Sequence, residues 1–176
     1  MPTRQQLLLA FCLLTPVSLF AEMPNGGICA HQGDNAAFPA NTVPAFKSAA
    51  DKGAAMVEMD VQRCANGELV IMHDATVDRT TNGTGEIARL TFEQIRALDA
   101  GVKKSPKFAG TKVPTFDEAI GCLPKDGIWI NVHCSDNVAD EVAKTIKEKG
   151  RLHQAFISTS LSAIQRARKV VPGILS

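Results

Sequence analysis

The chain has 176 residues, of which 45% are hydrophobic and 21% charged, and its 19 Lys and Arg nearly balance its 18 Asp and Glu. This composition is ordinary for one globular domain and excludes a long disordered or fibrous chain. A net charge of +1 argues against nucleic-acid binding driven by overall charge. After residue 21 no apolar run approaches the ~18 residues of a membrane-spanning helix, so we expect no span in the mature chain.

The first 21 residues predict a secretory signal peptide. Arg4 precedes an apolar stretch at residues 7–20, and Ala21 offers a small residue for cleavage. We therefore expect the protein to be exported, to a periplasm or to the cell exterior, with residues 22–176 forming its one domain.

From residue 27 onward, short apolar strands alternate with amphipathic helices, which is typical of an α/β domain with parallel strands. We predict strands at residues 27–31, 55–62, 68–74, 128–134, 155–159 and 173–176, and helices at 42–53, 137–150 and 161–171. Thr91 with Gln94, and Thr115 with Glu118, are capping boxes that begin two short helices. The chain thus holds four strand–helix units and the start of a fifth.

The second and third strands are too close in sequence for a parallel crossover, which needs about a dozen residues. We therefore predict an antiparallel hairpin closed by Asn66-Gly67 as a two-residue type I′ turn. In that register Asp60 lies directly opposite His73. Since alternate residues of a strand share a face, Glu58 lies beside them. The hairpin thus brings two acids and one imidazole together.

These side chains suit metal-assisted chemistry. In an α/β barrel functional groups lie at the carboxyl ends of strands, where His31 and His133 end their strands and Glu58 and Asp60 lie late in theirs. Paired carboxylates suit a hard cation such as Mg²⁺ or Ca²⁺, and two histidines beside it would supply a base and an acid. A phosphodiester is the natural substrate, because the cation neutralises phosphate oxygens. Such a carboxylate pair is also commonly solvated or salt-bridged, and this alternative stays open.

Seven short motifs occur along the chain in an order and spacing that are specific to one protein family. They are residues 30–33 (AHQG), 39–46 (PANTVPAF), 57–61 (VEMDV), 73–81 (HDATVDRTT), 83–85 (GTG), 98–101 (LDAG) and 113–115 (VPT). Together they closely resemble the glycerophosphodiester phosphodiesterase family over nearly all of the mature chain. The resemblance implies an eight-stranded TIM-type barrel, related to phosphatidylinositol-specific phospholipases, that uses a divalent cation to hydrolyse glycerophosphodiesters to glycerol 3-phosphate and an alcohol. It makes His31 and His73 the acid/base pair and Glu58 and Asp60 metal ligands.

The chain departs from the family pattern at four positions. Gln32 replaces an Arg, Ala40 a Glu, Asn131 the third ligand Glu, and His133 the Lys two residues on. The family residues sum to zero charge, and so do the replacements when His133 is neutral. We hypothesise that Asn131 and His133 complete the cation site and that Gln32 contacts the substrate. Fewer carboxylates and an imidazole shift metal preference from Ca²⁺ or Mg²⁺ toward transition metals.

Eight strand–helix units need ~200–250 residues, whereas removal of the signal peptide leaves 155 of the 176. We therefore expect an incomplete α/β barrel with the hairpin carrying His73: a fragment of a longer product, half of a pair with a second copy, or a nonfunctional remnant. The functional alternatives are a relative that binds phosphodiesters with little or no turnover, and a phospholipase for larger lipids. The substrate head group, the metal and the oligomeric state stay open.

Overall fold

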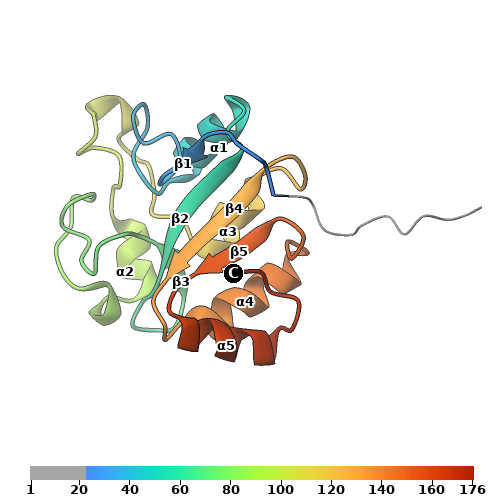
Figure 1. The fold of residues 1–176 in the computed structure, drawn as a ribbon. Coiled ribbons are helices and arrows are strands. Elements are labelled where there is room, and N and C mark those ends of the chain that lie inside the picture. The colour runs from blue at the N-terminus through green and yellow to red at the C-terminus, as the bar shows by residue number, and fades with distance from the viewer. Residues whose placement is uncertain (1–22) are drawn as a thin grey trace, which may run out of the picture.

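The sheet that carries the site consists of four parallel strands in the order β1-β2-β4-β5, with a short antiparallel strand, β3, added to β2 (Figure 1). The computed structural model describes residues 23–176, so the predicted signal peptide lies outside the described residues. The strands are β1 (Cys29–Ala30), β2 (Met56–Arg63), β3 (Leu69–Ile71), β4 (Trp129–Cys134) and β5 (Ala155–Ser158). The helices are α1 (Val43–Asp51), α2 (Phe92–Ala97), α3 (Phe116–Gly121), α4 (Ala139–Glu148) and α5 (Leu161–Val170), with 3-10 turns at Ile87–Arg89 and Pro106–Phe108. The α/β prediction is confirmed.

Strand alternation divides β2 into two faces with different tasks. Val57, Met59 and Val61 are fully buried and pack in one core with α1, α3, α4 and α5. Glu58 and Asp60 therefore point to the opposite face, toward the barrel interior. Both capping boxes predicted from the sequence are present, at the starts of α2 and α3. The helices thus cover one face of the sheet and leave the acids on the other.

The hairpin between β2 and β3 is antiparallel as predicted, but its turn and register differ. Arg63 pairs with Leu69 and the backbone N–H of Cys64 donates to the carbonyl of Glu68, which leaves a loop of three residues, 65–67. In this register Met72, not His73, lies opposite Asp60. A type I′ turn requires positive φ at both central residues, whereas Gly67 is the only residue of this loop with positive φ. The side chain of Asn66 is fixed by a neighbouring segment: its Oδ1 accepts a hydrogen bond of 2.9 Å from the backbone nitrogen of Phe92. With this turn the register differs by one residue from the predicted one.

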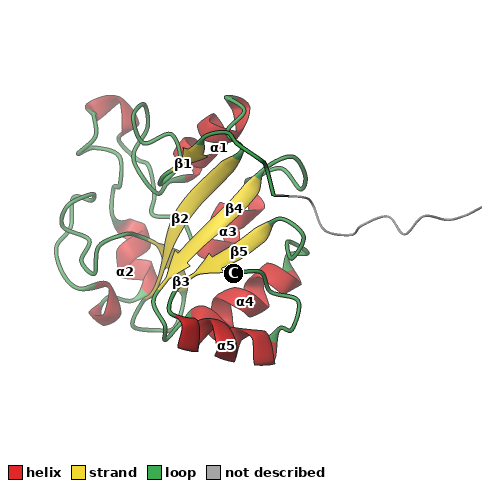
Figure 2. Cartoon of the chain, viewed as in Figure 1, coloured by secondary structure: helices red, strands yellow, loops and turns green. Residues whose placement is uncertain are grey.

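Residues 72–114 form a lobe beside the sheet, which is mostly loop (Figure 2). Its small separate core is built from Val77, Ile87, Ile95, Ala100 and Val113, together with buried residues of the hairpin. The lobe lies over the β2 side of the sheet, next to the inner face (Figure 1). It therefore forms one wall of the space in front of the acids.

The end of the chain returns to the sheet. Leu175 bridges Phe156 in parallel, and its carbonyl accepts a hydrogen bond of 3.0 Å from Ile157. The strand predicted at residues 173–176 is thus present as a single bridge beside β5. Within residues 23–176, no helix combines the length and the apolar character that crossing a membrane requires.

Candidate active site

Glu58 and Asp60 form the centre of the site and are buried, at 7% and 4% exposure. The loop after β1 closes over them: the Gln32 backbone N–H donates to Glu58 Oε2 at 2.9 Å, and the Gln32 side-chain amide donates to Asp60 Oδ2 at 3.1 Å. Asn41 Nδ2 also donates to Asp60 Oδ2, at 2.8 Å. Burial and, secondarily, the charge of Asp60 raise the pKa of Glu58. The two acids therefore lie in a setting that favours a nearby positive charge.

The same loop is held in an uncommon conformation. Gln32 and Asn41 have φ of 58° and 57°, in the left-handed region that residues other than glycine seldom adopt. A Cβ at Gly33 would lie 2.7 Å from the backbone of Ala45. Only glycine therefore allows the loop to pack this closely against α1. Strain of this kind persists where the surroundings fix it, and here it turns both amide side chains toward Asp60.

β4 brings the other two predicted ligands to the acids. In the parallel register Glu58 pairs with Asn131 and Asp60 with His133, so all four share the inner face. His133 Nδ1 lies 3.0 Å from Asp60 Oδ1, and Asn131 Oδ1 accepts a hydrogen bond of 2.7 Å from Ser158. One ligand atom from each of Glu58, Asp60 and His133 lies within 4.8 Å of the others. Glu58, Asp60 and His133 therefore converge, and Asn131 shares their face of the sheet.

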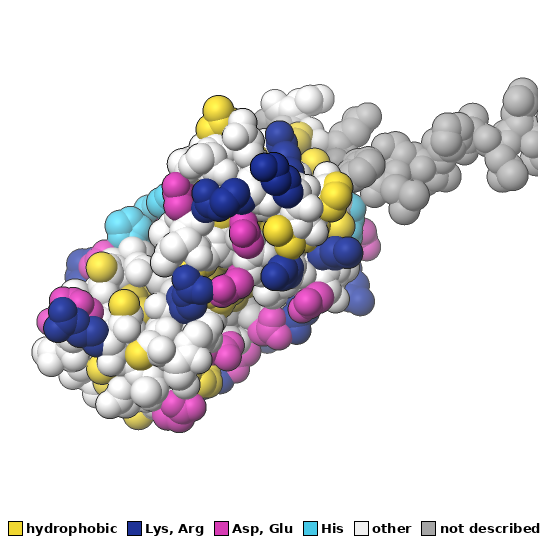
Figure 3. Space-filling view, turned by 90° about the horizontal axis from the view of Figure 1, so that it is seen from below, with side chains coloured by type: hydrophobic (Ala, Val, Ile, Leu, Met, Phe, Trp, Pro, Cys, Tyr) yellow, Lys and Arg dark blue, Asp and Glu magenta, His cyan; other side chains and the backbone are white. Residues whose placement is uncertain are grey.

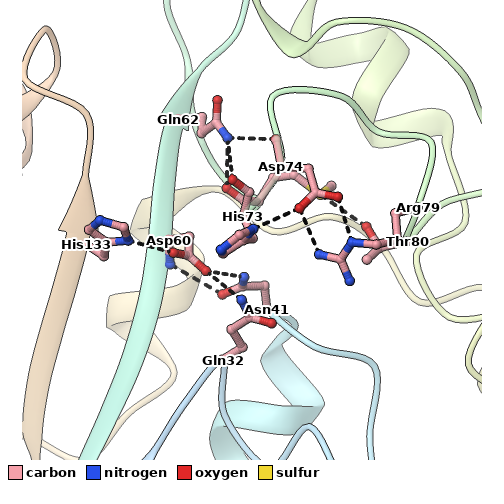
Figure 4. A network of polar contacts seen from close by, with 10 residues as sticks. Gln32, Asn41, Asp60, Gln62, His73, Asp74, Arg79, Thr80 and His133 are labelled. Carbon is pink, nitrogen blue, oxygen red and sulfur yellow. Dashed lines mark hydrogen bonds and ion pairs between the residues drawn. The ribbon is translucent and has the colours of Figure 1, made fainter.

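This donor set fits a divalent cation. Carboxylate oxygens are the usual ligands of Mg²⁺ and Ca²⁺, and an imidazole suits transition metals. His133 Nδ1, 3.0 Å from Asp60 Oδ1, is the ring nitrogen that lies beside the acids and could join them as a ligand (Figure 4). The residues present thus supply two acids, one ring nitrogen and, on the same face, the amide oxygen of Asn131.

His73 lies two residues beyond β3, on the lobe side of the acids (Figure 4). Its Nδ1 is 2.8 Å from Asp74 Oδ1, and Arg79 donates to both oxygens of Asp74 at 2.6 and 2.9 Å. The sequence predicted that His73 lies directly opposite Asp60. That prediction is wrong, because the one-residue shift of the hairpin places Met72 there, and the carboxylate that contacts the ring is Asp74.

The contacts of His73 also set its charge. The hydrogen bond to Asp74 is the main cause that raises the pKa of His73, and the charge of Asp60 adds to it. Arg79 in turn lowers the pKa of Asp74 to about 2, so this carboxylate stays ionised. Gln62 Nε2 donates to the carbonyls of His73 and Asp74 at 2.9 and 2.7 Å and fixes the backbone that carries the ring.

His31 follows β1 at the edge of the sheet, on the other side of Glu58. Its carbonyl accepts a hydrogen bond of 2.9 Å from Asn35, which holds the backbone of the loop, and its side chain is exposed. Its charge is one of the influences that lower the pKa of Glu58 against the effect of burial. His31 is thus close enough to act electrostatically on Glu58, as Asp60 acts on His73.

Four residues of this network were not singled out from the sequence: Asn41, Gln62, Asp74 and Arg79. Asn41 lies within the PANTVPAF motif, and Asp74 and Arg79 lie within HDATVDRTT, so the motifs carried the signal. Gln62 shares the inner face of β2 with Glu58 and Asp60, which is the strand alternation that located the acids.

Comparisons with known proteins identify the family of this chain. Residues 31–172 match the Glycerophosphoryl diester phosphodiesterase family. A glycerophosphodiester phosphodiesterase of Caldanaerobacter subterraneus is 36% identical over 152 residues, which cover 82% of this chain and 63% of the relative. Human glycerophosphodiester phosphodiesterase 1 is 46% identical over 97 residues, covering 53% of this chain and 29% of its own length.

Solved structures show the same fold. The glycerophosphodiester phosphodiesterase of Agrobacterium tumefaciens superposes with a TM-score of 0.77 at 31% identity, over 84% of this chain and 64% of that one. A phosphodiesterase of Oleispira antarctica, solved with the product sn-glycerol-3-phosphate, gives 0.74 at 27% identity, over 85% of this chain and 64% of its own. The present chain thus spans somewhat less than two thirds of these relatives, and its sheet is an incomplete TIM-type barrel, as predicted. It belongs to the glycerophosphoryl diester phosphodiesterase family.

Proposed function

We propose that the protein hydrolyses glycerophosphodiesters to glycerol 3-phosphate and an alcohol, with His31 and His73 as its acid/base pair. The observation that carries the proposal is the buried pair Glu58 and Asp60, joined by His133. The charge of His31 acts on Glu58, and the charge of Asp60 acts on His73. The product bound in the Oleispira antarctica phosphodiesterase supports the substrate class.

The proposed cation ligands are Glu58, Asp60, Asn131 and His133. When bound there, a divalent cation would supply positive charge that offsets the negative charge of the phosphate oxygens. Two carboxylates, an amide oxygen and an imidazole make this a softer site than three carboxylates would be. We therefore propose that it accepts Mg²⁺ or Ca²⁺ and tolerates transition metals.

The two histidines divide the proton transfers between them. Attack on phosphorus by water or by the neighbouring glycerol hydroxyl requires a base to take the proton of the nucleophile, and the departing alkoxide requires an acid. The contact with Asp74 favours the protonated ring of His73. We therefore assign His73 to protonation of the leaving alkoxide and His31 to the nucleophile.

Gln32 is proposed to contact the substrate. Its side chain is buried against Asp60, and it lines the cleft in front of His73 together with Arg79. An amide there offers a neutral donor and acceptor, whereas an arginine would bring a charge into the space beside the acids.

Release of glycerol 3-phosphate from glycerophosphocholine, with and without a chelator, tests the proposal. Either single variant, His31→Ala or His73→Ala, is expected to lower kcat by ~10²–10⁴ if the ring acts as a general acid or base. His153→Ala is the matched control, because that half-buried ring contacts the carbonyl of Lys125 and lies outside the site. Undiminished hydrolysis by the double histidine variant would end the assignment, and binding without any turnover would identify a binding protein.

A further inference from the structure

A second pocket opens beside the acids, with a volume of about 300 Å³. It is formed by the loop after β1 and by the lobe of residues 72–114, and its positively charged lining residues are Arg79, Lys103 and Lys104. None of its lining residues is Asp or Glu. By contrast, the face of the molecule seen from below mixes Lys and Arg with Asp and Glu (Figure 3). The pocket is thus positively charged on a protein that is nearly neutral overall.

The two lysines hold their charges at the pocket without a carboxylate partner among residues 23–176. Lys103 donates to the carbonyl of Asp78, and Lys104 donates to the carbonyl of Asn35 at 2.7 Å. The carboxylate of Asp78 is itself turned to the backbone nitrogen of Gly85. Arg79 is neutralised by Asp74, so two positive charges in the pocket remain uncompensated.

This pocket continues into the cleft in front of His73. Gln32, Ala40, Arg79, Thr80 and Ala100 line both spaces, and His73 lines the narrower one. The side chain of Ala40 ends at its methyl group, and any longer side chain at that position would extend toward the shared lining. A ligand in the pocket would therefore lie on the His73 side of the acids, where we place the departing alcohol.

We propose that this pocket binds a phosphate monoester carried by the alcohol half of the substrate, a proposal that rests on the proposed phosphodiesterase activity. Ammonium groups form short, charge-assisted hydrogen bonds with phosphate oxygens, and two lysines match the two charges of a phosphate monoester. The volume lies at the lower end of the ~300–1,000 Å³ that is usual for small-molecule sites, which suits a polyol phosphate rather than a larger group.

Two substrates that differ by one phosphate test the proposal: glycerophosphoinositol and glycerophosphoinositol 4-phosphate. The measured quantity is the ratio of kcat/KM for the phosphorylated substrate to that for the unphosphorylated one. In the Lys103→Gln, Lys104→Gln variant we expect this ratio to fall about a hundredfold, because two charge-assisted contacts are lost and each is worth about tenfold. The control is Lys144→Gln, Lys147→Gln on α4, which removes the same charge from exposed positions outside the site. An equal fall in both variants, or none in either, overturns the proposal.

Direct binding separates this pocket from the catalytic assignment. Titration calorimetry with inositol 4-phosphate, inositol and inorganic phosphate uses the His31→Ala, His73→Ala protein, with and without the two lysine substitutions. Selective binding of inositol 4-phosphate that the lysine substitutions abolish supports the pocket even if no variant hydrolyses anything. Hydrolysis of both substrates without such binding refutes the pocket and leaves the phosphodiesterase activity standing. Equal binding of inorganic phosphate overturns the assignment to the alcohol half.

Discussion

Replacing Asp74 by Asn removes the carboxylate that orients His73 while preserving the size of the side chain. The two side chains are 48% and 28% exposed, so water screens their charges and we assign the ion pair no more than about 1 kcal/mol. That free energy changes the ratio of protonated to neutral His73 by about fivefold. Loss of orientation adds to this effect, since removing a residue that positions a functional histidine typically costs 10–100-fold. The two effects multiply, so we expect kcat/KM to fall by about 50–500-fold in total.

The pH profile distinguishes a positioning role from a merely structural one. Asp74 raises the pKa of His73, so the protonated ring persists to higher pH. If His73 protonates the leaving group, activity is lost as pH rises through this pKa, and Asp74→Asn moves that loss to lower pH. Arg79 lowers the pKa of His73 and leaves Asp74 ionised. Arg79→Gln is therefore expected to move the same limb in the opposite direction.

The assay is kcat/KM for glycerophosphocholine measured across pH at constant ionic strength for both variants. Opposite displacements of the alkaline limb support the assignment. A limb that stays in place in both variants, or moves upward in Asp74→Asn, would refute the reasoning that His73 acts as the acid under the control of Asp74.

The remaining predictions concern the cation, the acids and a helix cap. His133→Ala removes the ring nitrogen, so calorimetric titration should show a reduced preference for Mn²⁺ over Mg²⁺; an unchanged preference contradicts its role as a ligand. Asn41→Ala leaves buried groups of Asp60 without their partners, and urea unfolding should show a loss of about 1–3 kcal/mol. Thr91→Ala removes the N-cap of α2 and should cost about 1 kcal/mol in the same assay, whereas a change near zero would mean that this lobe unfolds separately.

Local signals in the sequence predicted most of the fold. The capping boxes at Thr91 and Thr115 were correct because each involves backbone groups within three residues, which no distant contact alters. The turn at Asn66-Gly67 was assigned wrongly because the same two residues suit more than one turn. The hydrogen bond from Phe92 to Asn66 decided between them, and that contact spans 26 residues. Register in this hairpin was therefore a tertiary property.

The candidate site likewise has one part that local sequence patterns predict and another that depends on tertiary structure. Strand alternation and parallel register are enough to bring Glu58, Asp60 and His133 together, because all three lie within regular strands. The partner of His73 was beyond this reasoning. Neighbours in a strand point to opposite faces, which would separate His73 from Asp74. The strand ends at Ile71, however, and the bend that follows lets the two side chains meet.

The four departures from the family pattern fall into two neighbouring pairs. Gln32 and Ala40 line the same pocket, and Asn131 and His133 share the inner face of β4. Each pair replaces one positive and one negative family residue, so the net charge near the acids is unchanged. Replacing only one member of a pair would leave a buried charge unpaired, which is costly. Gln32 still donates to both acids, and His133 still places a nitrogen beside Asp60. We expect such paired replacements where Glu58 and Asp60 must keep hydrogen-bond donors beside them. The pattern therefore favours a variant active site over a decayed one.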